Sequence, residues 1–186
     1  MSASDPVVIV GMARTPMGAM LGELAGFSAN ELGAHAIKAA MAEAGVQGEE
    51  VELVYMGNCL PAGQGQAPAR QAAIHAGLPA SARTVTVHKV CGSGMQAVIH
   101  AAQVLQLDMA SVAVAGGMEN MSLAPYLLPG ARDGYRLGHQ RVVDSLVADG
   151  LWDPYNNQKI GSCAEQCAGR YGLTRERQDA YAVASF

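Results

Sequence analysis

The chain has few charged residues and no concentration of positive charge. Only 15% of its 186 residues are charged, the 12 lysines and arginines form no cluster, and the formal net charge is −4. A protein that binds a phosphate backbone needs a basic patch, so we expect no nucleic-acid partner. Half of the residues are hydrophobic and 22 are glycines. This composition excludes a disordered tail or a coiled coil and predicts a packed globular chain with many turns.

Features of secreted and membrane proteins are also missing. None of the four cysteines belongs to a C-x-x-C pair, and residues 1–6 resemble neither a secretory signal nor a transit peptide. The longest uncharged stretch worth testing as a membrane span, residues 90–107, contains one histidine and three glutamines, which makes it too polar. We therefore expect reduced thiols, a cytoplasmic location and no membrane partner.

Strand and helix patterns alternate through the first 120 residues. Apolar runs predict strands over 6–11, 51–57, 84–88 and 111–115. Helix patterns lie between them, from Ser28 to near Gly45 and over 66–77 and 93–107. Ser28 with Glu31 three residues later predicts a capping box at the start of the first helix. The β-α-β-α-β-α-β order predicts a layered α/β fold with helices on the faces of one sheet.

After residue 120 the pattern is broken by glycines and prolines, until Thr174 is placed to cap a last helix. The sequence therefore predicts a first domain over residues 1–120 and a second region over 121–186. The last helix pattern reaches Phe186 without a capping residue. We expect the chain to be part of a longer protein.

The most informative stretch joins the third predicted strand to the third predicted helix and contains Cys91. A cysteine at a helix N-terminus lies near free amides and the positive end of the helix dipole, which favour the thiolate. Gly92 and Gly94 leave room for a substrate carbonyl, and the amide of Cys91 can point at a developing oxyanion. This arrangement suits acyl transfer through a thioester. The alternative is a buried, inert cysteine in front of a glycine-lined helix.

Other patterns suggest weaker hypotheses. Gly92-x-Gly94-x-x-Ala97 matches a dinucleotide-binding fingerprint, but the next predicted strand runs into glycines where an acidic residue is required. Cys163 and Cys167 are four residues apart without a histidine or carboxylate pair, so we expect no metal site. Cys59 lies in a predicted loop and has no assigned role. The five histidines are scattered, and none is nominated as a base.

Several motifs together resemble the N-terminal half of the thiolase family. They are the opening run and Arg-Thr-Pro loop over 8–18, QGQAPARQ over 64–71, CGSG over 91–94, AGGMENMS over 115–122 and the helix ERQDAYA over 176–182. The family motif around the nucleophile commonly starts with asparagine, and His88 occupies that position here. The resemblance covers nearly the whole chain. It implies a thiolase-like layered fold with a mixed sheet, followed by the start of a loop domain that covers CoA.

The resemblance also implies an activity. Cys91 would accept an acyl group from acyl-CoA and pass it to a second acetyl-CoA, giving acetoacetyl-CoA and CoA, or run the reverse thiolysis. The substrates would be CoA thioesters, with no permanently bound cofactor, and the protein would be a homodimer or homotetramer. The family takes its catalytic base from motifs in a second domain that these 186 residues lack. We therefore expect the 186 residues alone to be inactive.

The same resemblance suggests contacts to the CoA arm. Leu137 and Leu151 fall in segments where the family contacts pantetheine. The next family contact is usually His-Met before a glycine, and Lys159 and Ile160 take these places here. Two functional alternatives remain: a thiolase for longer 3-ketoacyl-CoA substrates, and an incomplete subunit with a structural role.

Overall fold

The computed structural model describes residues 6–185. The chain divides into two compact units, one up to Ser145 and one from Leu146 onward. The domain boundary expected near residue 120 stays a prediction.

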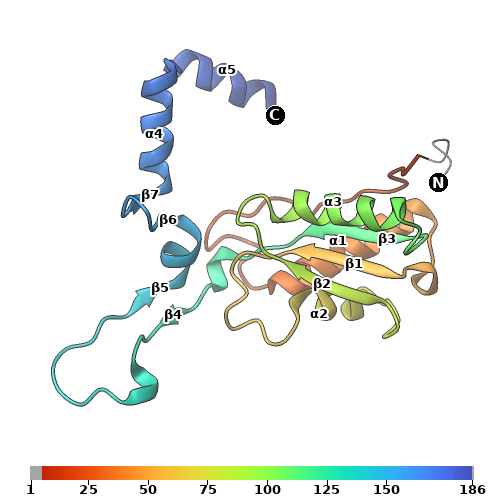
Figure 1. Cartoon of the computed structure of the whole chain (residues 1–186), viewed down its shortest axis with the longest axis horizontal. Helices are drawn as coiled ribbons and strands as arrows, with labels where there is room; N and C mark the ends of the chain where they lie inside the picture. The colour runs from red at the N-terminus through yellow and green to blue at the C-terminus, as the bar shows by residue number, and fades with distance from the viewer. Residues whose placement is uncertain (1–5, 186) are drawn as a thin grey trace. The chain divides into compact units, whose positions relative to one another are not determined.

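A parallel three-stranded sheet forms the centre of the first unit (Figure 1). Strand β1 (Leu53–Gly57) lies in the middle, between β2 (Arg83–Val87) and β3 (Ala113–Gly117). Gly57 pairs with the last residue of both neighbours, so the carboxyl ends of all three strands are level. Three of the four predicted strands are therefore confirmed, each within two residues at either end.

Three helices cover this sheet. Helix α1 (Ala29–Ala44) has the predicted capping box between Ser28 and Glu31, and it ends at Gly45 with φ of +68°. Helix α2 (Pro68–His75) starts with proline, whose missing N–H costs nothing in a first turn. Helix α3 (Ser93–Gln106) leads from β2 to β3. The α/β class and the alternating order of elements are confirmed.

The two faces of the sheet pack against different helices. Val54 and Met56 belong to the buried core together with apolar residues of α1 and α2. Side chains alternate along a strand, so Tyr55 and Gly57 face the other way, toward α3. The Tyr55 ring centroid lies 5.8 Å from that of His100 on α3. The sheet thus separates α3 from α1 and α2.

The predicted first strand is wrong for this structure. Residues 7–10 form no strand, and Ile9 is 78% exposed. This segment instead leads to α1, where Gly11 lies against Ala40 and Ala44, and the amide of Met12 donates to Glu43 (2.8 Å). A β-branched run becomes a strand only when a neighbour supplies ladder hydrogen bonds, and no described strand pairs with it. The sheet is therefore parallel throughout its described strands, where the sequence predicted a mixed one.

Smaller elements follow the sheet. In the first unit, β4 (Tyr126–Leu127) pairs antiparallel with β5 (Val143–Asp144). In the second unit, a π-helical segment (Leu146–Leu151) precedes β6 (Trp152–Asp153), which pairs with β7 (Gln158–Lys159). Helices α4 (Ile160–Tyr171) and α5 (Arg175–Ser185) complete that unit. The amide of Arg177 donates to the Thr174 hydroxyl at the predicted cap of α5 (3.4 Å). Short 3-10 turns lie at Gly48–Glu50, Met121–Leu123 and Ala131–Asp133.

The start of α3 packs directly on the ends of two strands through glycines. A Cβ atom on Gly57 would lie 2.5 Å from the Ser93 carbonyl carbon and 2.6 Å from the Gly94 nitrogen. A Cβ atom on Gly117 would lie 3.3 Å from the Gly94 Cα. Only residues without side chains permit backbones to come this close. These glycines set the position of the helix that follows Cys91.

We predict that Gly57→Ala destabilises the protein by about 1–3 kcal/mol, because the new methyl group overpacks the start of α3. Urea unfolding of the full-length protein measures this change. Gly26→Ala is the matched control, since a Cβ there meets nothing within 4 Å. Equal unfolding midpoints for the two variants would contradict the packing argument.

Candidate active site

Cys91 lies in the turn between β2 and α3, as predicted. It directly precedes Gly92, the N-cap residue of α3, and its side chain is exposed. The thiol is therefore accessible at the positive end of a helix of 14 residues. The alternative of a buried cysteine at this position is wrong.

The residue before Cys91 has an unusual conformation that its neighbours hold in place. Val90 has φ of +48°, which a β-branched residue rarely adopts. The Ser93 hydroxyl donates to the Val90 carbonyl (2.5 Å) and accepts from the Lys89 amide (2.8 Å), while the Val90 amide donates to His88 Nδ1 (3.3 Å). Ser93 is buried. Strained residues held by several contacts are typical of functional turns.

Free amides lie at Cys91 and in the first turn of α3. The amides of Ser93 and Gln96 donate to the carbonyls of Val90 and Gly92. Within residues 6–185, the backbone amides of Cys91, Gly94 and Met95 have no hydrogen-bond acceptor. Free N–H groups at a helix start bind negative charge. This turn can therefore stabilise an oxyanion that forms next to Cys91.

A carboxylate ties the neighbouring turn to the same edge of the sheet. Glu119 follows β3 and accepts hydrogen bonds from the amides of Cys59 (2.7 Å) and Leu60 (3.2 Å). It also accepts from the side-chain amide of Asn58 (2.8 Å), which is 1% exposed. The turn that follows β1 is thereby fixed next to the one that contains Cys91.

Cys59 links these two turns. Its thiol donates to the Val90 carbonyl (2.7 Å) and lies 3.4 Å from the Ser93 hydroxyl. Burial raises the pKa of the Cys59 thiol, and the negative charges of Glu119 and a Cys91 thiolate raise it further, against the lowering effect of Ser93. Cys59 is therefore a protonated thiol that supports the peptide in front of Cys91.

The roles of Cys59, Ser93 and Glu119 were not predicted from the sequence. The positions of Cys59 and Glu119 relative to the predicted strands could have indicated that these two residues lie close together. Cys59 comes two residues after β1, and Glu119 comes two residues after β3. Because the carboxyl ends of neighbouring parallel strands meet at one edge, residues that follow them lie close together.

Gly94 lies against the end of strand β3. A Cβ atom at this residue would lie 3.6 Å from the Gly117 nitrogen, which is an ordinary van der Waals distance. The expectation that Gly94 leaves room for a substrate carbonyl stays a prediction.

Three of the four predicted CoA contacts lie at one end of the β6–β7 hairpin in the second unit. Trp152 pairs with Lys159, Leu151 precedes Trp152 at the end of the π-helical segment, and Ile160 follows Lys159 at the start of α4. Asp153 accepts from the Tyr155 amide and the Asn156 side chain in the hairpin turn, and these hydrogen bonds lower its pKa. The fourth predicted contact, Leu137, belongs to the other unit and is 95% exposed.

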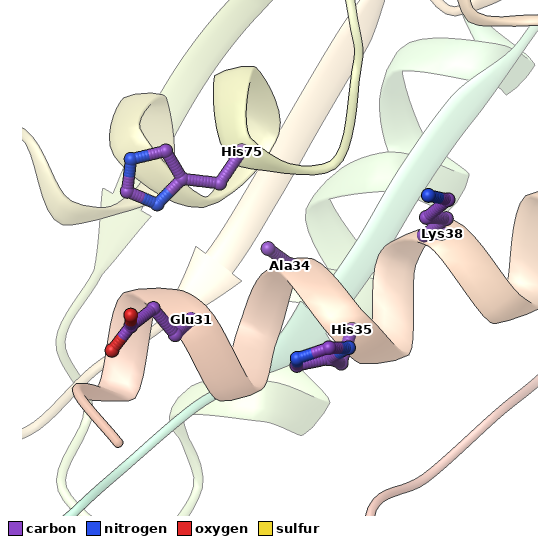
Figure 2. Close-up of a pocket in the computed structure, with 5 residues that line it drawn as sticks. All are labelled: Glu31, Ala34, His35, Lys38 and His75. Atoms are coloured by element: carbon purple, nitrogen blue, oxygen red, sulfur yellow. The ribbon is translucent and has the colours of Figure 1, made fainter. Parts of the chain in front are cut away.

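No base or metal cluster accompanies Cys91 among the described residues. No hydrogen bond there joins its thiol to a histidine or carboxylate, and no three histidine, cysteine, aspartate or glutamate side chains in residues 6–185 form a metal-binding group. Two histidines instead line a hollow of about 390 Å³ between α1 and α2 (Figure 2). Its lining residues are Glu31, Ala34, His35, Lys38 and His75.

This hollow lies on helices that pack on the opposite face of the sheet from α3. His35 therefore has no access to the Cys91 turn within the first unit. Within residues 6–185, no helix combines the length and apolar character that a membrane crossing requires.

Comparison with known proteins identifies a family. The family model described as "Thiolase, N-terminal domain" matches residues 7–186. The chain is 55% identical over 179 residues to an acetyl-CoA acetyltransferase of Cupriavidus necator, covering 96% of this chain and 46% of that protein. It is 55% identical over 180 residues to acetyl-CoA acetyltransferase 2 of Arabidopsis thaliana, covering 97% and 45%.

A mitochondrial acetyl-CoA acetyltransferase of Aspergillus fumigatus is 49% identical over 178 residues, covering 96% of this chain and 41% of that protein. The chain thus spans about half the length of the relatives it matches.

We predict that Glu119→Ala destabilises the protein by about 1–3 kcal/mol, because three donors, including the buried Asn58 amide, lose their acceptor. Urea unfolding of the full-length protein is the measurement. The exposed Glu49 serves as control, and Glu49→Ala should change stability by no more than about 0.5 kcal/mol. If both variants unfold at the same urea concentration, the carboxylate does not hold the turn.

Proposed function

Because this chain belongs to the thiolase family, we propose that Cys91 is the nucleophile of a thiolase that transfers acetyl groups between CoA thioesters. One observation carries the proposal: an exposed thiol directly precedes α3, and its own amide has no acceptor within residues 6–185. The relatives named acetyl-CoA acetyltransferase support the choice of acyl group.

The geometry suits two half-reactions at one sulfur. The Cys91 thiolate attacks the thioester carbonyl carbon of acetyl-CoA, and the negative charge that forms on the oxygen is stabilised by the free amides of the turn. The carbon–sulfur bond to CoA breaks, and CoA leaves as a thiolate, which becomes the thiol when a general acid donates a proton to it. The acetyl group on Cys91 then passes to the carbanion of a second acetyl-CoA, which forms the new carbon–carbon bond. Thiolysis is the reverse sequence.

The proton transfers need a group beyond those described. A carbanion forms only when a base removes a proton next to the thioester carbonyl, and such assistance contributes about 10²–10⁴-fold. We propose that this base lies outside residues 1–186. His88 is held by the Val90 amide and serves to fix the turn.

We further propose that Leu137, Leu151, Lys159 and Ile160 contact the CoA arm. For the three residues in the second unit, the support is that they lie at one end of the β6–β7 hairpin, where Lys159 pairs with Trp152, the residue after Leu151. We also propose a homodimer or homotetramer. The four free cysteines fit a reducing compartment such as the cytoplasm.

We predict that incubation of the full-length protein with acetyl-CoA adds one acetyl group to Cys91, because its thiol is accessible at the helix start. Intact mass and peptide mapping measure the adduct. Cys91→Ser should lower turnover by at least about 10³-fold, and Cys167→Ser, a change of an exposed thiol in α4, should leave it unchanged. An acetyl group on Cys59, Cys163 or Cys167 instead of Cys91 would contradict the assignment of Cys91 as the nucleophile.

We also predict a preference for short substrates, as the names of the relatives suggest. Initial rates of CoA-dependent cleavage should give a higher kcat/KM for acetoacetyl-CoA than for a 3-ketoacyl-CoA with a longer chain. A higher value for the longer substrate would reject the short-chain assignment and leave Cys91 in its role.

A further inference from the structure

We propose that Cys59 and Cys91 form a reversible disulfide when a peroxide oxidises the protein, so that Cys59 protects the nucleophile from irreversible oxidation. The proposal rests on the proposed function only for its effect on activity. The disulfide itself needs only that the two sulfur atoms can reach each other and that one of them is accessible to a peroxide.

The contacts of Cys59 place the two thiols together. The oxygen that accepts its hydrogen bond belongs to the peptide that joins Val90 to Cys91. Since that S···O distance is 2.7 Å, covalent geometry puts the Cys59 sulfur within roughly 5.5 Å of the Cys91 Cα. A disulfide holds the Cβ atoms of its two cysteines about 3.5–4.5 Å apart, so both side chains must turn toward each other for the sulfurs to bond. The Cys91 side chain is exposed, and rotation about χ1 turns it toward Cys59 in the step we propose.

The two thiols differ in the ways that such a pair requires. Cys91 is exposed at a helix start, where a peroxide has access to its sulfur. Cys59 is half-buried, and burial raises its pKa, so it stays protonated and is protected from direct oxidation. Oxidation therefore begins at Cys91 and is resolved by Cys59.

The backbone keeps Cys59 in this position. Glu119 holds the Cys59 amide, and the Asn58 amide donates to the last residue of β2, Val87 (3.0 Å). Formation of the disulfide therefore requires side-chain rotation with little backbone movement. Cys163 and Cys167 belong to α4 in the other unit.

The chemistry balances with hydrogen peroxide as the oxidant. The Cys91 thiolate attacks one peroxide oxygen, the O–O bond breaks, and the hydroxide that leaves takes a proton to become water, which gives a sulfenic acid. The Cys59 sulfur then attacks the Cys91 sulfur. The S–O bond breaks, and the departing hydroxide takes the Cys59 proton as a second water. Two thiols are oxidised to one disulfide, and one peroxide is reduced to two waters.

The experiment treats the full-length protein with hydrogen peroxide, then maps peptides under non-reducing conditions and measures acetoacetyl-CoA cleavage before and after dithiothreitol. We predict a Cys59–Cys91 linked peptide, a mass lower by two hydrogen atoms, and loss of activity that dithiothreitol reverses. In Cys59→Ser the same peroxide dose should carry Cys91 to the sulfinic acid, and the loss should not be reversed. Activities are compared with each variant's own starting value.

Cys167→Ser is the matched control, and it should form the linked peptide and recover as the unchanged protein does. The proposal fails if Cys91 reaches the sulfinic acid equally fast with and without Cys59, or if the disulfide joins another pair. Its failure is distinct from that of the proposed function, because acetylation of Cys91 is measured separately. A linked pair without acetylation would reject only the function, and acetylation without a linked pair would reject only the disulfide.

Discussion

The close packing of the start of α3 on the ends of β1 and β3 is the constraint from which the site follows. Gly57 and Gly117 let backbone meet backbone there, and a methyl group at Gly57 would lie 2.5 Å from the Ser93 carbonyl carbon. The helix is thereby held with its N-terminus level with the strand ends. Cys91 is then at the edge of the sheet with free amides beside it. The reactivity proposed for its thiol depends on this packing.

Hydrogen bonds also join the loops that follow the strands at the carboxyl edge of the sheet. Glu119 joins the turn after β1 to the one after β3, and the Cys59 thiol joins the turn after β1 to the Val90 peptide. The left-handed conformation of Val90 has a cost that these contacts and the Ser93 hydroxyl offset. The same set of contacts therefore fixes the turn that carries the proposed nucleophile, Cys91, and holds Cys59 next to that turn.

The two units contribute separately to the chemistry we propose. The unit up to Ser145 holds the proposed nucleophile, the proposed oxyanion donors and Leu137, and the unit from Leu146 onward holds the other three residues proposed to contact CoA. The relatives are about twice as long as this chain. Within residues 6–185 no base is joined to the Cys91 thiol by a hydrogen bond. This division agrees with a base supplied from beyond residues 1–186.

Local patterns determined much of this protein from sequence alone. The Ser28 capping box, the end of α1 at Gly45 and the position of Cys91 between strand and helix were all predictable, because each depends on residues close together in the chain. Tertiary structure decided the rest. Residues 7–10 have the composition of a strand, but they have no partner among the described strands. Cys59 and Glu119 have their roles because the strand register places the carboxyl ends of β1, β2 and β3 at the same level. Such contacts join residues 30 to 60 positions apart, and a sequence pattern that describes single elements does not contain their pairing.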